Sequence, residues 1–152
     1  MLTLTEEQIK EIAGDLDVGM KCYYNKLTGE IKTIINSESW EYADSNAWDE
    51  DIEEIEENWS DYVEFESFRS DESFQIMVDY AESIDNKKLQ EKLFNALNKS
   101  HPFRNFKWHI DNAGEYRQKW FDYKNQRFID HVKEQIEVYN GLEEFKKLQE
   151  NE

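Results

Sequence analysis

The spacing of apolar residues changes once along this 152-residue chain, and that change constrains the fold more than any other feature. Between residues 18 and 36, and again between 62 and 68, apolar and polar residues largely alternate, as they do in β-strands. From residue 70 to 139 apolar residues recur every three or four positions, as in amphipathic helices. We therefore predict a single α+β domain over 1–140, with a small antiparallel sheet and a helical C-terminal half, then a polar tail over 141–152.

Turn and cap residues set the boundaries of the N-terminal elements. Thr5 and Gln8 predict a capping box at the start of a helix over 4–13, which we expect Gly14 to end. The strands at 18–25 and 30–36 are predicted to form a hairpin whose turn ends at Gly29, a residue free to adopt positive φ. A third strand is predicted at 62–68.

The remaining pattern is helical after an irregular stretch at 37–46. A helix at 47–60 is expected to pack through Trp48, Ile52, Ile55 and Trp59. Later helices are predicted at 70–84 with Ser70 as the cap, 87–98, 102–112 with Pro102 in the first turn, and 115–139 with Gly141 as its end.

Charge is distributed very unevenly along the chain. Residues 38–85 contain 18 acidic residues and one basic residue, a balance of −17, which equals the net charge of the whole chain. Residues 86–133 contain 11 basic and 5 acidic residues, a balance of +6. This composition disfavours binding of the whole molecule to nucleic acid or an anionic membrane, but leaves room for a local basic patch.

The sequence predicts a cytoplasmic protein, bacterial in origin. The first residues lack the basic and apolar regions of a signal peptide, and no apolar stretch approaches the ~20 residues of a membrane span. The single cysteine, Cys22, cannot form an internal disulfide, which fits a reducing compartment. We therefore expect no membrane association.

Several segments resemble one family of uncharacterised bacterial proteins, number 0158 of the UPF series. They are the hairpin from Tyr23 to Ile31, the Asp71–Met77 helix, the Phe103-Arg104-Asn105-Phe106-Lys107 core, and Trp120 to Tyr123. In this chain Ser100-His101-Pro102 replaces a small glycine-rich entry to the Phe-Arg helix. The resemblance covers most of residues 6–138 and implies the fold and a bacterial cytosolic setting, but no reaction.

The leading functional hypothesis is a non-enzymatic interaction protein that binds a basic protein partner through the acidic segment 38–85. Its candidate face consists of Glu50, Glu53, Glu54, Glu56 and Glu57. Two alternatives are a merely solvated surface and mimicry of a nucleic-acid phosphate surface.

The second hypothesis is a module that binds nucleic acid or another anionic ligand through the basic and aromatic region 103–128. Its candidate residues are Arg104, Lys107, Trp108, Arg117, Trp120, Tyr123 and Lys124. Bases stack on aromatic rings while cations hold phosphates. Under the alternative interpretation the rings pack inward, as Phe103, Phe106 and Ile110 are expected to do, and the charges are solvated or paired.

A third hypothesis is a metal-dependent hydrolase. Glu30-Ile31-Lys32 has the acid-x-lysine form of some nucleases, with Asp15 or Asp17 upstream. The acidic stretch that starts at Asp44 lacks the glycine of a calcium loop. The histidines show no metal-ligand spacing, so we predict no metal, cofactor or catalytic residue, and we interpret Cys22 as a buried small hydrophobe. The oligomeric state is not predictable from the sequence.

Overall fold

The structure, a computed structural model, describes residues 1–35 and 48–151. The irregular stretch predicted at 37–46 and the acidic stretch that starts at Asp44 lie outside these residues. The chain divides into two compact units. The sheet unit contains Met1–Ser67 and Phe128–Glu152, and the helical unit contains Phe68–Arg127. The single domain over 1–140 stays a prediction.

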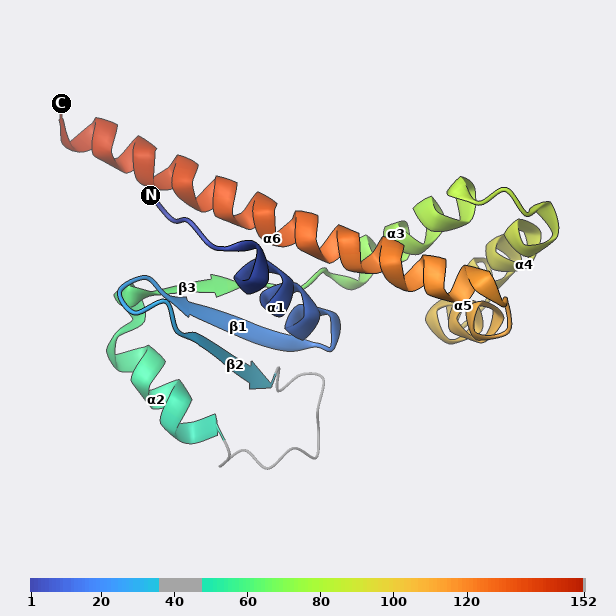
Figure 1. The fold of residues 1–152 in the computed structure, drawn as a ribbon, viewed down its shortest axis with the longest axis horizontal. Helices are drawn as coiled ribbons and strands as arrows, with labels where there is room; N and C mark the ends of the chain where they lie inside the picture. Colours follow the sequence, from blue (N-terminus) through green and yellow to red (C-terminus); the bar gives the residue numbers. More distant parts are fainter. Residues whose placement is uncertain (36–47, 152) are drawn as a thin grey trace. The chain divides into compact units, whose positions relative to one another are not determined.

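A three-stranded antiparallel sheet forms the centre of the sheet unit (Figure 1). Its strands are β1 (Met20–Asn25), β2 (Ile31–Ile35) and β3 (Tyr62–Phe65), in the order β2-β1-β3. In the central strand Cys22 pairs with Thr33 on one side and Phe65 on the other. The sheet and the helices confirm the predicted α+β class, the hairpin and the third strand.

The hairpin turn is held by a buried amide. The side-chain oxygen of Asn25 accepts hydrogen bonds from the backbone N–H groups of Leu27 (2.8 Å) and Thr28 (3.1 Å). Gly29 has φ of +77°, as the turn requires. Asn25 is buried, so these bonds also satisfy a polar group that would otherwise destabilise the core.

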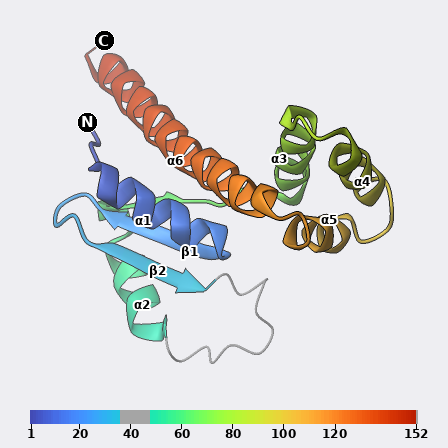
Figure 2. The ribbon, with the colours of Figure 1, turned by 45° about the vertical axis from the view of Figure 1, so that its right-hand side comes forward.

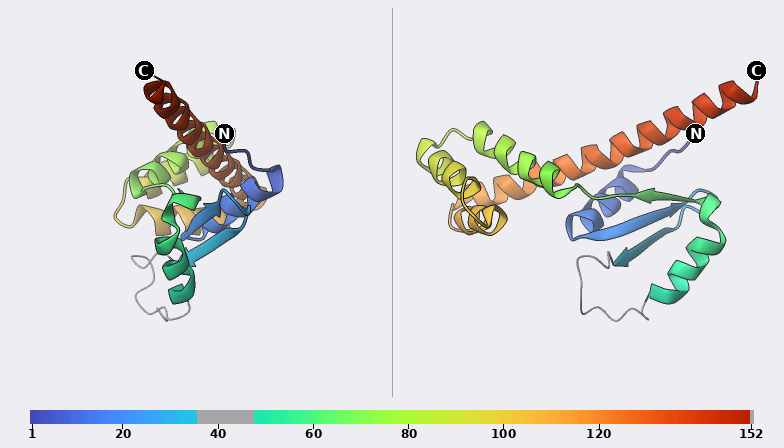
Figure 3. Two further views of the ribbon diagram at one scale, coloured as in Figure 1. Left: turned by 90° about the vertical axis from the view of Figure 1, so that its left-hand side faces the viewer. Right: turned by 180° about the vertical axis from the view of Figure 1, so that it is seen from behind.

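Helices lie on both faces of the sheet (Figure 3). Helix α1 (Glu6–Asp17) packs on β1 and begins with the predicted Thr5–Gln8 capping box. On the other face lies α2 (Asp49–Glu57). Its residue Ile55 forms a small apolar cluster with Ile34 of β2 and Tyr62 of β3. A 3-10 helix, η2 (Trp59–Asp61), connects α2 to β3.

Two predictions for these helices are wrong. Helix α1 continues through Gly14 to Asp17, because its buried face extends to Leu16 and no turn requires the glycine. The predicted apolar stripe of α2 breaks down at Ile52 and Trp59, which are 37% and 74% exposed. The α-helix ends at Glu57, so the change to 3-10 geometry removes Trp59 from the face that holds Ile55.

Four helical segments build the helical unit (Figure 2). They are α3 (Ser70–Ser83), α4 (Lys87–Leu97), α5 (Pro102–Asp111) and the first part of α6 (Glu115–Glu150). Arg69 is the N-cap residue of α3, one position before the predicted Ser70. The core of the unit contains Met77, Leu93, Phe106 and Trp120.

Helix α6 is longer than predicted. It runs through Gly141 to Glu150, so the predicted end at Gly141 is wrong and most of the predicted tail is helical. In the sheet unit, His131 and Gln135 contact the carbonyl oxygen of Glu66 (2.9 and 3.1 Å). No helix in the described ranges has both the length and the apolar character needed to cross a membrane.

Candidate nucleic-acid interface

Helix α5 has one buried and one exposed face. Phe106 and Ile110 are buried in the helical core. The exposed face carries two cations and two aromatic rings, namely Arg104, Lys107, Phe103 and Trp108. Trp108 is 62% exposed, and Phe103, which the sequence predicts to be core, is exposed as well. At 3.6 residues per turn Arg104, Lys107 and Trp108 share one side of the helix, and Phe103 lies at its edge next to the buried face.

Helix α4 packs against α5 and brings further cations to this region. Lys92 and Lys99 lie near His109, whose pKa is lowered first by partial burial and then by these two positive charges. The rings of Trp108 and His109 meet edge-on with centroids 5.0 Å apart. Lys92 of α4, Lys99 just after α4 and the exposed tryptophan of α5 therefore lie around His109.

Few negative charges balance these cations. The described residues offer no ion pair to any of the exposed basic side chains of this region, which are Lys87, Lys88, Lys92, Lys99, Arg104 and Lys107. Glu91 is the one acidic residue between 87 and 110. We define the α4–α5 basic surface as Lys92, Lys99, Phe103, Arg104, Lys107 and Trp108.

Sequence reasoning missed the two lysines of this surface. Leu89 and Leu93 mark the buried face of α4, so the helical period already places Lys92 toward solvent. What the sequence did not contain was the packing of α4 on α5, which brings Lys92 and Lys99 toward His109.

The aromatic residues predicted on α6 are not available for stacking. Trp120 is only 8% exposed, and its ring lies 5.0 Å from that of Phe106 in the core. Tyr123 is half-buried, with its ring 5.3 Å from that of Tyr80. Both rings pack into the helical core instead, so the structure does not support the expectation that they stack on a ligand.

The cations predicted on α6 have partners within the helical unit. Arg117 forms an ion pair with Asp111 (3.3 Å) and lies over the ring of Phe121 (4.7 Å). Lys124 lies over the rings of Trp120 and Phe121. Their charges are already engaged, so of the predicted basic and aromatic set only Arg104, Lys107 and Trp108 stay free to meet a ligand.

The predicted acidic face on α2 is exposed except for one residue. Glu50, Glu53, Glu56 and Glu57 are exposed and form no ion pair with any residue that the structure describes. Glu54 is half-buried and accepts hydrogen bonds from the Tyr62 hydroxyl and the Asn58 amide. The predicted place of Glu54 on the outer face is therefore wrong.

The acid-x-lysine motif is part of a structural network. Lys32 forms ion pairs with Asp51 (2.9 Å) and Glu30 (3.7 Å). Asp15 accepts a hydrogen bond from Thr33 (3.0 Å). Over residues 1–35 and 48–151, no three His, Cys, Asp or Glu side chains are placed to hold a metal ion.

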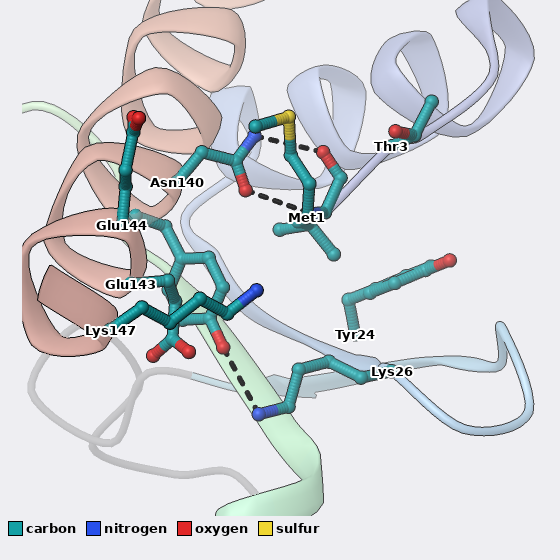
Figure 4. A pocket seen from close by; sticks show the side chains of 10 residues that line it. Met1, Thr3, Tyr24, Lys26, Asn140, Glu143, Glu144 and Lys147 are labelled. Carbon is teal, nitrogen blue, oxygen red and sulfur yellow. Dashed lines mark hydrogen bonds between the residues drawn. The ribbon is translucent and has the colours of Figure 1, made fainter. Parts of the chain in front are cut away.

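A pocket of about 640 Å³ opens in the sheet unit between the N-terminal residues, the hairpin turn and α6 (Figure 4). The amine of Lys26 donates a hydrogen bond to the Tyr139 hydroxyl (3.0 Å) across it. Lys147 lines the pocket together with Glu143 and Glu144. Charges of both signs alternate around the opening, so its chemistry selects neither an anion nor a cation.

Fold and surface together define a small α+β protein with an acidic sheet unit and a basic, tryptophan-bearing face on its helical unit. The chain belongs to the Uncharacterised protein family (UPF0158), whose family model matches residues 1–148. This membership confirms the resemblance seen in the sequence. No curated protein and no solved structure matches the chain.

Proposed function

We propose that this chain is a non-catalytic binding protein whose ligand is a nucleic acid, held at the α4–α5 basic surface. The observation that carries the proposal is the exposed Trp108 ring among cations that have no acidic partner in the described residues. An exposed tryptophan among unpaired cations offers both contacts that an unpaired nucleotide needs, a ring for the base and positive charge for the phosphate.

The charge distribution is compatible with this function despite the acidic composition. The helical unit contains 11 basic and 9 acidic residues, a balance of +2, so the sheet unit carries a balance of −19. Within the helical unit, residues 87–110 hold six lysine and arginine side chains against Glu91. Because the Debye length is ~8 Å at physiological salt, charges close to the ligand determine its binding more than distant acids do.

Fluorescence anisotropy with a labelled oligothymidylate of about 15 nucleotides tests the proposal. We expect Trp108→Ala to weaken binding roughly tenfold, since stacking contributes about 1–3 kcal/mol per base. Arg104→Ala combined with Lys107→Ala should weaken binding and lower the steepness of its salt dependence by about 1.4, given a slope of ~0.7 per phosphate contact.

Matched controls come from the same chain. Trp59→Ala removes a tryptophan of similar exposure from the sheet unit. Arg69→Ala with Lys119→Ala removes two exposed cations of the helical unit that have acidic partners. Both controls should bind as the parent does. Loss of binding in the controls equal to that in the test variants, or no binding by the parent, would contradict the proposal.

A second candidate is binding of a basic protein by α2. The supporting observation is that Glu50, Glu53, Glu56 and Glu57 are exposed without ion pairs in the described ranges, with Trp59 exposed two residues later. Carboxylates followed by an exposed tryptophan offer the two kinds of side chain found in many protein interfaces, a charged rim and an aromatic anchor.

A pull-down from native bacterial lysate at low and moderate salt tests this candidate. Changing the four glutamates to glutamine should remove a salt-sensitive basic protein from the eluate while oligonucleotide binding stays intact. Glu6→Gln with Glu7→Gln and Glu11→Gln, which neutralises exposed acids of α1, is the control. If the α1 variant loses the same protein, the α2 face is not the docking site. We further propose a cytoplasmic setting, which the single buried Cys22 supports.

A further inference from the structure

The last turns of α6 carry an apolar stripe that nothing covers among the described residues. It consists of Val138, Leu142, Phe145 and Leu148, each between 57% and 62% exposed. The spacings of four, three and three place all four side chains on one side of the helix. Exposed apolar residues scattered singly are common, but a continuous stripe on one helix face marks an interaction surface.

This stripe lies opposite the face of α6 that packs in the sheet unit. Ile129 and Val132 are buried, and about two to three turns later Tyr139 and Asn140 bond to Lys26 and Leu2. At about 100° per residue, these positions lie on the other side of the helix from Phe145. In Figure 1 the end of α6 continues past the sheet. A second helix could therefore reach the stripe without displacing the elements of the sheet unit.

The two edges of the stripe differ in charge. Glu137 and Glu144 border one edge, and Lys146 borders the other. Glu144 forms no ion pair within the described chain, and Lys146 has one exposed contact, to Glu143 of its own helix at 3.8 Å. When two copies pair in parallel, the acidic edge of one faces the Lys146 edge of the other. An antiparallel pair would place each edge against itself, Glu144 against Glu144.

We propose that the chain forms a parallel homodimer through the Val138–Leu148 stripe of α6. The interface is small, so self-association is weak and depends on concentration. The helix is already formed and anchored in the sheet unit, so pairing incurs no cost of helix nucleation. Each dimer carries two α4–α5 basic surfaces, which would raise its avidity for a long polyanion.

Sedimentation velocity of the full chain from about 10 µM to about 1 mM is the primary test. The parent mass should rise toward twice the monomer mass as concentration increases. Phe145→Glu should weaken the association roughly tenfold or more, since it places a charge at the centre of the stripe. Lys147→Glu, on the opposite side of the helix, is the matched control and should associate as the parent does. A monomeric parent, or a Phe145→Glu variant that associates normally, would overturn the proposal.

Orientation is tested by two further variants. Val138→Cys should form an intermolecular disulfide under mild oxidation, because residue 138 meets its own counterpart only in the parallel arrangement. The native Cys22 is buried and does not compete. Glu144→Lys should weaken the dimer, and adding Lys146→Glu to it should restore the association. The parallel arrangement would be excluded if the dimer gave no Val138→Cys cross-link. It would also be excluded if Glu144→Lys associated as the parent does, or if adding Lys146→Glu to it did not restore the association.

Discussion

Cys22 shows how burial controls the chemistry of a single side chain. Its thiol is fully buried and lies 3.8 Å from a carboxylate oxygen of Asp15. Burial, followed by the negative charge of Asp15, raises the pKa of the thiol to about 12. The reactive thiolate is therefore scarce at neutral pH, and reagents cannot reach it in the folded protein.

We expect native Cys22 to react with Ellman's reagent at pH 8 far more slowly than the same thiol in concentrated urea. Absorbance of the released thionitrobenzoate measures both rates. An exposed thiol introduced by Val138→Cys should react within the mixing time and serves as the control, since Val138 is more than half exposed. Rapid reaction of the native thiol at low protein concentration would contradict the burial of Cys22.

His109 offers a local probe of the proposed ligand. Its pKa is lowered by partial burial and by Lys92 and Lys99. Because the unfolded chain holds a proton on His109 more readily, this residue makes folding less favourable as pH falls through about 6.5. A bound phosphate would offset the charges of the two lysines and so raise the pKa of His109. Ligand binding should therefore become stronger as the pH falls through about 6.5, because the bound state holds the proton on His109 more readily.

An NMR titration of the histidine Cε1–H resonances, with and without oligothymidylate, measures this coupling. The pKa of His109 should rise on binding, whereas the resonance of His131, which lies in the sheet unit against the Glu66 carbonyl, should keep its position when oligothymidylate is added at constant pH. Oligonucleotide binding that leaves the pKa of His109 unchanged would place the ligand elsewhere on the molecule.

The contrast between Trp108 and Trp120 shows where sequence reasoning fails at single residues. Both tryptophans follow lysines on predicted helices, so the basic and aromatic pattern treats them alike. The structure buries Trp120 and exposes Trp108, because only the packing of four helices decides which side of each helix is inside. The spacing of residues shows which sides of a helix could be buried, but it does not show which side the packing actually buries.

At the scale of elements, most of the fold was predictable. The hairpin, the third strand, α1 with its capping box and the four C-terminal helices all follow from period and cap residues. Two of the errors concern glycine. Gly14 and Gly141 were predicted to end helices, yet both lie inside one. Glycine only permits a helix to end, and neither residue is among those with positive φ.

Gly14 therefore offers a stabilising substitution. A Cβ atom at this position would meet nothing within 4 Å, and the residue lies inside α1, before its last three residues. We expect Gly14→Ala to raise the free energy of unfolding by about 0.5–1 kcal/mol, measured by urea denaturation with unchanged m-value. Gly114→Ala is the control and should destabilise, because Gly114 has φ of +58° although space around it is equally open. Equal effects of the two substitutions would contradict this argument.

For the whole molecule, the acidic and basic parts of the sequence are only partly paired with each other. In the helical unit Asp79 pairs with Arg127 (3.0 Å), and Asp85 accepts a hydrogen bond from Tyr116 (2.6 Å). These contacts join the acidic segment to the basic one that follows it. Among the described residues, the exposed acids of α2 and the cations of the α4–α5 basic surface lie outside such pairs and face solvent.

This separation predicts how salt acts on stability. The sheet unit carries a balance of −19, so its carboxylates repel one another in the folded state more than in the expanded chain. Raising NaCl from about 20 mM to about 300 mM shortens the Debye length from ~20 Å to below 6 Å and weakens this repulsion. We expect the midpoint of thermal unfolding, followed by circular dichroism, to rise with added salt. The rise should be roughly 2–4 °C for each kcal/mol by which the free energy of unfolding increases.

Two variants show whether α2 is a main source of the repulsion. Changing Glu50, Glu53, Glu56 and Glu57 to glutamine should raise the midpoint at low salt and reduce the response to added NaCl. The same change at Lys87, Lys88, Lys92 and Lys99 makes the net charge more negative and should leave the response at least as large as in the parent. If both variants respond to salt as the parent does, repulsion among the α2 carboxylates contributes little to stability. The charge of this acidic face would then have little effect on the stability of the fold, and only solubility or a binding partner would explain it.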